Sequence, residues 1–265
     1  MENSPGTAAE TVVTGSRDHV RIVPLFAPEV FAPTAEAKPV SAPHLSYRGG
    51  PLLSAVKVVT VYWGGAWSAD TQLATTAADL DAFFDAVLTS ELMDQLAEYG
   101  VPGKPIGHGT RSMRAVVSTP APKAVLTDGE VQRMLQQELT TSALPAGDAN
   151  TLYFVYLPPG TAVTQGGSRS CQGFCGYHSD IGGTIFYAVM PYPSCAGCTG
   201  GLPVFDALTS TSSHELCEAV TDPVPGQGWY DDAHGEIGDI CAWKTRKIGK
   251  YLVQLEWSNT TNGCA

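Results

Sequence analysis

The chain has 265 residues, of which 43% are hydrophobic, and its 26 acidic and 15 basic residues give a net charge of −11 at pH 7. This length and apolar content suffice for one domain with a sizeable core, and the longest apolar runs are shorter than the roughly 18 to 20 residues of a membrane-spanning helix. The few basic residues are scattered, so we expect no nucleic-acid partner. The short apolar runs predict no membrane span. Composition says nothing about oligomeric state.

Residues 1–45 are rich in Pro, Ala and Glu and show little apolar periodicity, as in FAPEVFAPTAEAKPVSAP. We predict that this segment is extended or mobile, because it has too few periodic apolar residues to form a packed core. The start, MENSPGTAAETVVTG, has neither a basic stretch nor an apolar one, so no secretory signal is expected in the printed chain. A single folded domain is predicted over 46–265.

Strands and helices alternate along this domain. The β-branched run AVKVVTVYW predicts a buried strand over 55–63, and the apolar spacing after Ser68 predicts one long helix or a broken pair that ends at Gly100. Thr127 and Glu130 form a capping box that opens the next helix. The remaining predicted elements are strands at 112–118, 151–158 and 184–192, a helix at 205–221 and a last strand at 251–258.

This alternation predicts a three-layer α/β domain with a zincin-like mixed sheet, covered by helices and stabilised by disulfides. The Gly- and Ser-rich stretch 159–170 is predicted to be a mobile loop. The helix at 205–221 is expected to pack on a sheet formed by the strands at 55–63, 112–118, 151–158 and 184–192.

Six of the seven cysteines fall into pairs that are close in sequence or flank the last strand. These pairs are Cys171 with Cys175, Cys195 with Cys198, and Cys241 with Cys264. Parity predicts that each pair is a disulfide, that Cys217 stays reduced, and that the compartment is oxidising. Two alternatives stay open: a structural zinc site, because two short Cys pairs about twenty residues apart approach zinc-ribbon spacing, and independent free thiols.

Seven stretches carry a resemblance to a known family. They are LSYRGGPLLSAVKVVTVYWGGAW, FCGYH, FYAVMPYPSCAGC, SSHELCEAVTDP, WYDD, GEIGDIC and YLVQLEWSNTTNGC. In this order they resemble the Exordium family, also called phosphate-induced protein 1, of plant cell-wall proteins and their bacterial relatives. The resemblance covers 45–264, although Cys217 stands where an alanine-like residue is usual. It implies a secreted protein in an extracellular or wall-associated setting, and it leaves the activity open.

The stretch SSHELCEAVTDP, residues 212–223, places a histidine and carboxylates at helical spacing. On a helix His214, Glu218 and Asp222 share one face, while Glu215 points about 100° away. This is the HExxH arrangement of metalloproteases with a carboxylate in place of the second histidine. Imidazole and carboxylate both suit zinc, and a glutamate beside the first ligand can act as general base. We therefore predict His214 and Glu218 as zinc ligands and Glu215 as the catalytic residue.

A catalytic zinc site needs a third protein ligand and an open position. The carboxylate-rich loop GWYDDAHGEIGDIC supplies Asp239 and Glu236, which rank first because they follow the helix closely. His178, in the cysteine-flanked FCGYH, and Asp222 are the other candidates. The site is thus predicted to draw on residues from outside the helix.

Two other interpretations of these residues stay open. In one, the carboxylates are solvated and His214 is an ordinary core histidine. In the other, calcium is held by oxygen ligands alone, from Asp231, Asp232, Glu236 and Asp239. Two functions follow: a secreted zinc-dependent hydrolase, above all a peptidase with a peptide or cell-wall substrate, or a non-enzymatic extracellular binding or signalling protein with a structural calcium or carboxylate site.

Overall fold

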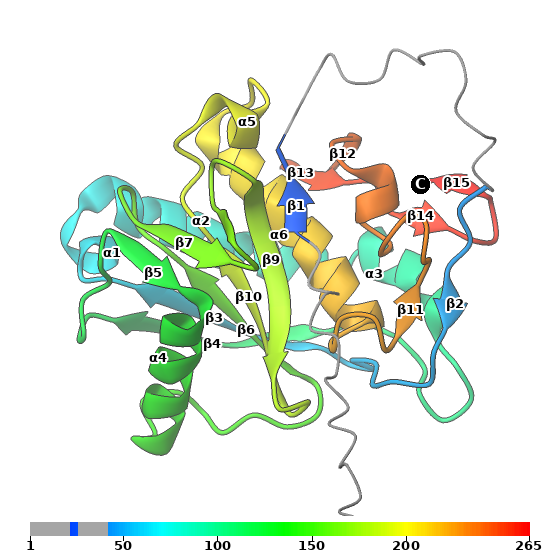
Figure 1. The fold of residues 1–265 in the computed structure, drawn as a ribbon, viewed down its shortest axis with the longest axis horizontal. Helices are drawn as coiled ribbons and strands as arrows, with labels where there is room; N and C mark the ends of the chain where they lie inside the picture. The colour runs from blue at the N-terminus through cyan, green and yellow to red at the C-terminus, as the bar shows by residue number, and fades with distance from the viewer. Residues whose placement is uncertain (1–21, 26–41) are drawn as a thin grey trace, which may run out of the picture.

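The computed structural model describes residues 22–25 and 42–265, and its centre is a six-stranded mixed sheet (Figure 1). The strand order is β1-β9-β10-β6-β3-β4. These strands are β1 Ile22–Pro24, β3 Lys57–Trp63, β4 Thr110–Val117, β6 Thr151–Tyr156, β9 Phe174–Ile181 and β10 Ile185–Met190. The four strands from β10 to β4 run parallel, whereas β9 is antiparallel to β10, and β1 is antiparallel to β9. The chain is therefore a mixed α/β protein.

Helices cover both faces of this sheet. The helices of the described chain are α1 Ala66–Ala69, α2 Thr71–Val87, α3 Glu91–Leu96, η1 Ala97–Tyr99, α4 Asp128–Thr140, α5 Ala196–Thr199, α6 Val204–Thr221 and η2 Asp239–Cys241. The apolar sides of α2, α3 and α6 share one core with alternate sheet residues such as Tyr62 and Phe154. Val61 and Val155, which neighbour these residues on the same strands, face a second core with α4. The helix α4 lies on the other face of the sheet from α2 and α6 (Figure 1). The helix 204–221 thus packs on the sheet containing the four predicted strands, as expected.

The helix boundaries follow local capping signals. The long helical region predicted after Ser68 is broken, because the Asp70 carboxylate caps α2 and the Ser90 hydroxyl caps α3. The predicted capping box is present at α4, where the Thr127 N–H donates to Glu130 Oε2 over 2.9 Å. Each cap supplies an acceptor for N–H groups that the first helical turn leaves unpaired.

Smaller sheets depart from the prediction. The stretch 159–170 is more than a loop, since it contains β7 Ala162–Gln165, which pairs with β5 Val125–Thr127, and β8 Ser168–Arg169, which pairs with β7. The predicted last strand at 251–258 is divided into β13 Tyr251–Gln254 and β14 Trp257–Ser258. These pair outside the main sheet, with β12 Thr245–Ile248 and β15 Gly263–Cys264. The remaining two-stranded sheet joins β2 Ser46–Tyr47 to β11 Trp229–Tyr230.

Of the predicted lead-in 1–45, residues 1–21 and 26–41 lie outside the described residues. Ile22–Pro24 is extended, as β1, and Val23 is buried beside Cys175 and Cys198. Trp243 Nε1 donates to the Pro24 carbonyl over 3.0 Å. This short stretch therefore joins the sheet through β9. No helix in the described part of the chain has the length and apolar character needed to cross a membrane.

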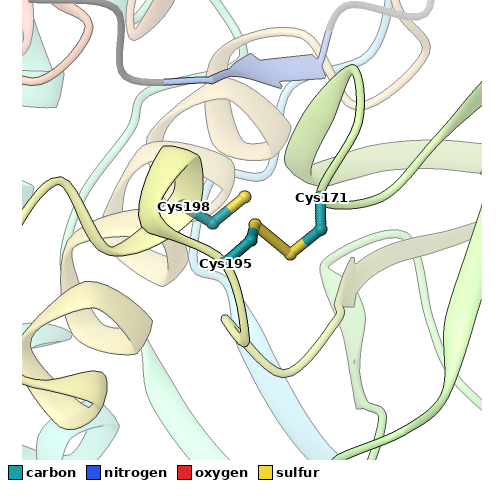
Figure 2. Close-up of side chains that lie close together, drawn as sticks. All are labelled: Cys171, Cys195 and Cys198. Atoms are coloured by element: carbon teal, nitrogen blue, oxygen red, sulfur yellow. A yellow bond between two sulfur atoms is a disulfide. The ribbon is translucent and has the colours of Figure 1, made fainter.

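Three disulfides are present, but two differ from the predicted pairs. The bridges are Cys171–Cys195, which Figure 2 shows, Cys175–Cys198 and Cys241–Cys264. The predictions 171–175 and 195–198 are wrong because α5 packs against the start of β9, so each sulfur meets one from the other segment. The four cysteines of the zinc-ribbon alternative are all in disulfides, so none is available as a thiolate ligand for zinc. Among the described cysteines, Cys217 is the free one, as predicted, and it is buried.

Candidate metal centre

The helix α6 runs through the interior of the protein. Proline at 203 precedes it and Pro223 follows shortly after its end, as expected for helix boundaries. Every residue from Ala207 to Thr221 is buried, and the helix is packed against β9, β10 and β13. Its polar residues therefore lie inside the protein, where a charge without a partner is costly.

The first group of side chains that could hold a metal joins α6 to the loop that follows it. His214 Nε2 lies 2.9 Å from Glu218 Oε1, and neither nitrogen of His214 has a hydrogen-bond partner among the described residues. The Asp239 backbone N–H donates to the same Glu218 oxygen over 3.1 Å. Single ligand atoms of His214, Glu218 and Asp239 lie within 4.8 Å of one another. The geometry therefore groups the predicted pair with Asp239.

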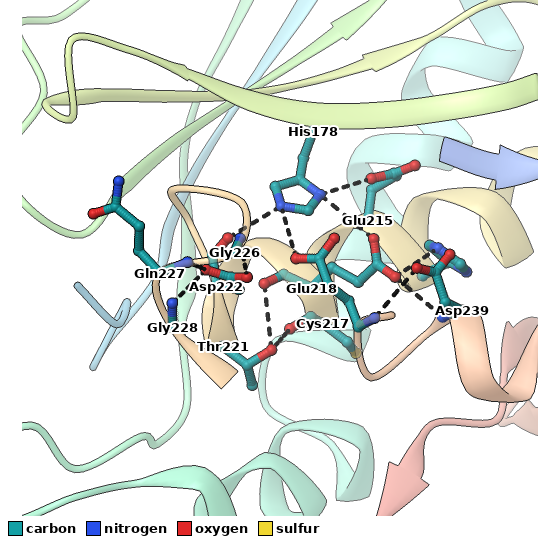
Figure 3. A network of polar contacts seen from close by, with 12 residues as sticks. His178, Glu215, Cys217, Glu218, Thr221, Asp222, Gly226, Gln227, Gly228 and Asp239 are labelled. Atoms are coloured by element: carbon teal, nitrogen blue, oxygen red, sulfur yellow. Dashed lines mark hydrogen bonds and ion pairs between the residues drawn. The ribbon is translucent and has the colours of Figure 1, made fainter. Parts of the chain in front are cut away.

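The second group joins α6 to β9. His178 Nδ1 lies 3.1 Å from Glu215 Oε2 and 3.5 Å from Glu218 Oε2, and all three side chains are fully buried (Figure 3). His178 Nε2 lies 3.1 Å from the Asp222 carbonyl oxygen. Because Glu215 and Glu218 lie on neighbouring positions of the helix surface, β9 reaches both. His178 thus belongs to the cluster, although β9 was not predicted as a strand.

Two more carboxylates border these groups. Glu236 Oε1 lies 3.5 Å from His178 Nε2, and both Glu236 oxygens lack a hydrogen-bond partner within the described residues. Glu256 is fully buried, and its oxygens likewise have no hydrogen bond in the part of the chain described. Sequence reasoning missed Glu256. The available signal was a lone carboxylate between Leu255 and Trp257 in a predicted strand.

Asp222 has a different role from the one predicted. Its carboxylate accepts hydrogen bonds from three successive backbone N–H groups, those of Gly226, Gln227 and Gly228, over 2.6, 3.0 and 2.5 Å. These bonds hold the turn that follows α6. Asp222 contributes to the cluster through its carbonyl oxygen, which faces His178, and we leave its carboxylate out of the ligand set.

The oxygen-only calcium set does not assemble. Asp231 accepts backbone hydrogen bonds from Ala233 and His234 within its own turn. The Asp232 side chain is 89% exposed and pairs with Arg48 over 2.6 Å. Within the described residues, neither aspartate joins a group of side chains that could hold a metal. The interpretation of solvated carboxylates also fails for α6, because Glu215 and Glu218 are fully buried.

The buried histidines and carboxylates of the cluster shift one another's pKa values. Burial works against the charged form of Glu218, but His214 and His178 outweigh it and lower the Glu218 pKa to about 2. Burial and the Glu218 charge raise the Glu236 pKa well above its usual value. Burial lowers the pKa of both histidines, but the neighbouring carboxylates raise it further, so the net shift is upward. The buried carboxylate oxygens and His214 nitrogens that have no hydrogen-bond partner among the described residues fit a divalent cation, which supplies positive charge and fills the orphaned lone pairs.

Two glycines let backbone close over the cluster. A Cβ at Gly238 would lie 2.8 Å from His214 Nδ1, and one at Gly176 would lie 3.3 Å from Glu215 Oε1. Any larger residue would push these side chains aside. The loop before η2 thus closes on His214, and the strand β9 closes on Glu215.

No family model matches the sequence, and the search of curated proteins gives no match. The functional argument therefore depends on the residues themselves.

Proposed function

We propose that the protein is a zinc-dependent hydrolase that acts on peptides, with the zinc held by His214, Glu218 and Asp239. One observation carries this proposal. His214 Nε2 and Glu218 Oε1 are 2.9 Å apart and fully buried, yet they are not aligned as a hydrogen bond, and Asp239 completes the group. Two ligand atoms that approach each other without forming a hydrogen bond leave their lone pairs free for a metal ion. An imidazole nitrogen and a carboxylate oxygen are both common zinc ligands.

Access to the zinc would come from the side of Asp239. This residue is half-buried, whereas His214 and Glu218 are 0% exposed. A catalytic zinc keeps one position for water or substrate, and the Asp239 side is where the described ligands approach solvent. The zincin-like part of the proposal is the placement of this group on a helix that packs against β9, the antiparallel strand between β10 and the edge strand β1.

The peptide substrate is proposed from the outer edge of β9. That edge pairs antiparallel with β1, in the register Ile22 with Tyr177. β1 occupies this edge only from Phe174 to Tyr177, and from His178 onward no described strand pairs with it, so an extended peptide could add there by β-strand addition. The same strand carries His178, so a peptide bound along β9 would pass beside the cluster.

Glu215 is the residue we assign to the chemical step. Bound zinc would act as a Lewis acid and lower the pKa of water. Glu215 Oε2 contacts His178, while Oε1 has no hydrogen-bond partner in the described part of the chain. Burial raises the pKa of this carboxyl group, which suits a group that takes a proton from water and passes it on.

Secretion and membership of the Exordium family are part of the same proposal. Disulfides and the lack of a spanning helix among the described residues are compatible with an extracellular protein. A second function, a non-enzymatic binding or signalling protein with a structural metal, is favoured by one observation. The group formed by His178, Glu215 and Glu218 is completely buried, as closed structural sites are.

The test measures zinc and peptide hydrolysis on the same preparations. Protein purified without chelator should contain zinc, and it should cleave a mixture of unstructured peptides in a reaction that a chelator stops. Glu215→Gln should lower cleavage at least about 100-fold, since general-base catalysis typically contributes that much. Glu138→Gln is the matched control, because Glu138 is also a buried helical glutamate but lies on α4.

The outcomes separate the two functions. Zinc-containing protein that cleaves no peptide would support the structural metal and reject the hydrolase. Protein with no zinc after exposure to zinc salts would reject both metal proposals.

A further inference from the structure

The two oxygens of Glu218 face two different histidines. Oε1 lies 2.9 Å from His214 Nε2, and Oε2 lies 3.5 Å from His178 Nδ1. Glu218 Oε2 has no hydrogen-bond partner among the described residues, although it is fully buried. A carboxylate oriented in this way lies between two groups of ligands rather than in one.

The His178 ring is oriented as metal-bound histidines are. Its Nε2 lies 3.1 Å from the Asp222 carbonyl oxygen, which can only accept a hydrogen bond, so the ring proton belongs on Nε2. The lone pair of Nδ1 then points toward the carboxylate oxygens of Glu215 and Glu218. A backbone carbonyl that fixes the tautomer from behind is the usual partner of a metal-binding histidine.

The spacing of this second group fits a metal ion. Ligands at about 2.1 Å from a tetrahedral zinc lie about 3.4 Å from each other. The Nδ1 of His178 is 3.1 and 3.5 Å from the two carboxylate oxygens. A lone pair facing two carboxylates would be repelled unless a cation lies between them or a second proton makes His178 an imidazolium. Glu236, 3.5 Å away on the Nε2 side, adds more negative charge.

We infer that His178, Glu215 and Glu218 hold a second divalent ion, and that Glu218 bridges the two ions with one oxygen on each. This inference rests on the proposed zinc at His214, Glu218 and Asp239 and extends it to a two-ion centre. Glu215 would hold the second ion through Oε2 and keep Oε1 for water. Mixed imidazole and carboxylate ligands favour zinc or another first-row ion over calcium.

The first experiment counts ions in the wild-type protein. Metal-free protein is titrated with Co²⁺, followed by absorption, and zinc is measured after reloading and dialysis. We expect saturation at about two equivalents, with magnetic coupling between the two Co²⁺ ions in electron paramagnetic resonance, because ions in two-metal sites lie about 3.5–4 Å apart.

The second experiment assigns the ions to residues. His178→Ala and Glu215→Gln should each bind one ion, and His214→Ala should also bind one. Glu256→Gln is the control, because this carboxylate is equally buried but belongs to neither group, and it should bind two. Circular dichroism identifies any variant that fails to fold, in which case the wild-type titration decides.

The failure of this inference is distinct from that of the proposed function. Saturation at one equivalent, unchanged by His178→Ala and lost in His214→Ala, would overturn the second ion, make His178 an imidazolium and leave the zinc hydrolase standing. Two equivalents retained in His178→Ala would also overturn the assignment. Absence of any bound ion would defeat both proposals.

Discussion

Replacing Gly238 by alanine tests whether the loop before η2 holds His214 in place. The backbone at Gly238 has φ −79° and ψ −39°, which alanine adopts without strain. The obstacle is the imidazole of His214, whose Nδ1, Cε1 and Cγ would lie 2.8, 2.9 and 2.9 Å from the new Cβ. Ordinary contacts between such atoms are about 3.5–4.0 Å, so the ring must move by roughly half an ångström or more.

The expected cost follows from this overlap. Overpacking a buried site costs about 1–3 kcal/mol, while the loss of glycine freedom in the unfolded chain returns about 0.4–1 kcal/mol. We expect Gly238→Ala to lower the free energy of unfolding by about 1–2 kcal/mol. The displaced ring should also lower zinc affinity, because metal–ligand distances tolerate only about 0.2 Å of error.

Gly65→Ala is the matched control. Gly65 has φ −61° and ψ −18°, and its Cβ would have Ser118 Oγ as nearest neighbour, at 3.7 Å. It should be neutral or slightly stabilising and keep its zinc. Urea unfolding of the metal-free proteins measures stability, and zinc content after dialysis against a weak chelator measures affinity. If Gly238→Ala matched Gly65→Ala in both, the reasoning about His214 would be refuted.

Three further predictions concern residues outside the metal groups. Hydrogen bonds from the Lys123 side chain and the Thr127 backbone N–H lower the Glu130 pKa to about 2. The free energy of unfolding that Glu130→Gln loses should therefore be constant above pH 4.5 and should vanish as the pH falls through about 2. Urea unfolding at several pH values measures this. Asp81→Ala removes the carboxylate oxygen that accepts from the Thr60 and Tyr62 hydroxyls, which keep only the Met113 and Ala77 carbonyls, and should cost about 1–3 kcal/mol in the same assay. Burial raises the Cys217 pKa, so a thiol reagent should label this residue only after unfolding, and labelling in the folded protein would contradict its burial.

Local signals in the sequence were sufficient for most helices and strands. The capping box of Thr127 and Glu130 and the i, i+4 placement of His214 and Glu218 depend only on neighbours along the chain, and both are found in the structure. Hydrophobic periodicity likewise located the parallel strands of the sheet. These features could be predicted because their physical causes act over a few residues.

Strand β9 escaped prediction because its sequence lacks a clear pattern. FCGYHSDI contains a glycine and three polar residues, yet it is a strand because β10 pairs along it over five residues, from Val189 to Ile185. Propensity is weak beside such a partner. The same pairing positions His178, which sequence distance ranked behind Asp239 and Glu236 as a candidate for the third ligand.

Only the tertiary structure decided which distant groups meet. The contact of α5 with β9 joins Cys171 to Cys195, and β9 brings His178 to Glu215 across 37 residues of chain. The two oxygens of Glu218 can be told apart only when β9 and the loop of Asp239 both pack against α6, because each brings a different group to one of the oxygens. Such contacts depend on how whole elements pack, and spacing along the chain carries no information about that packing.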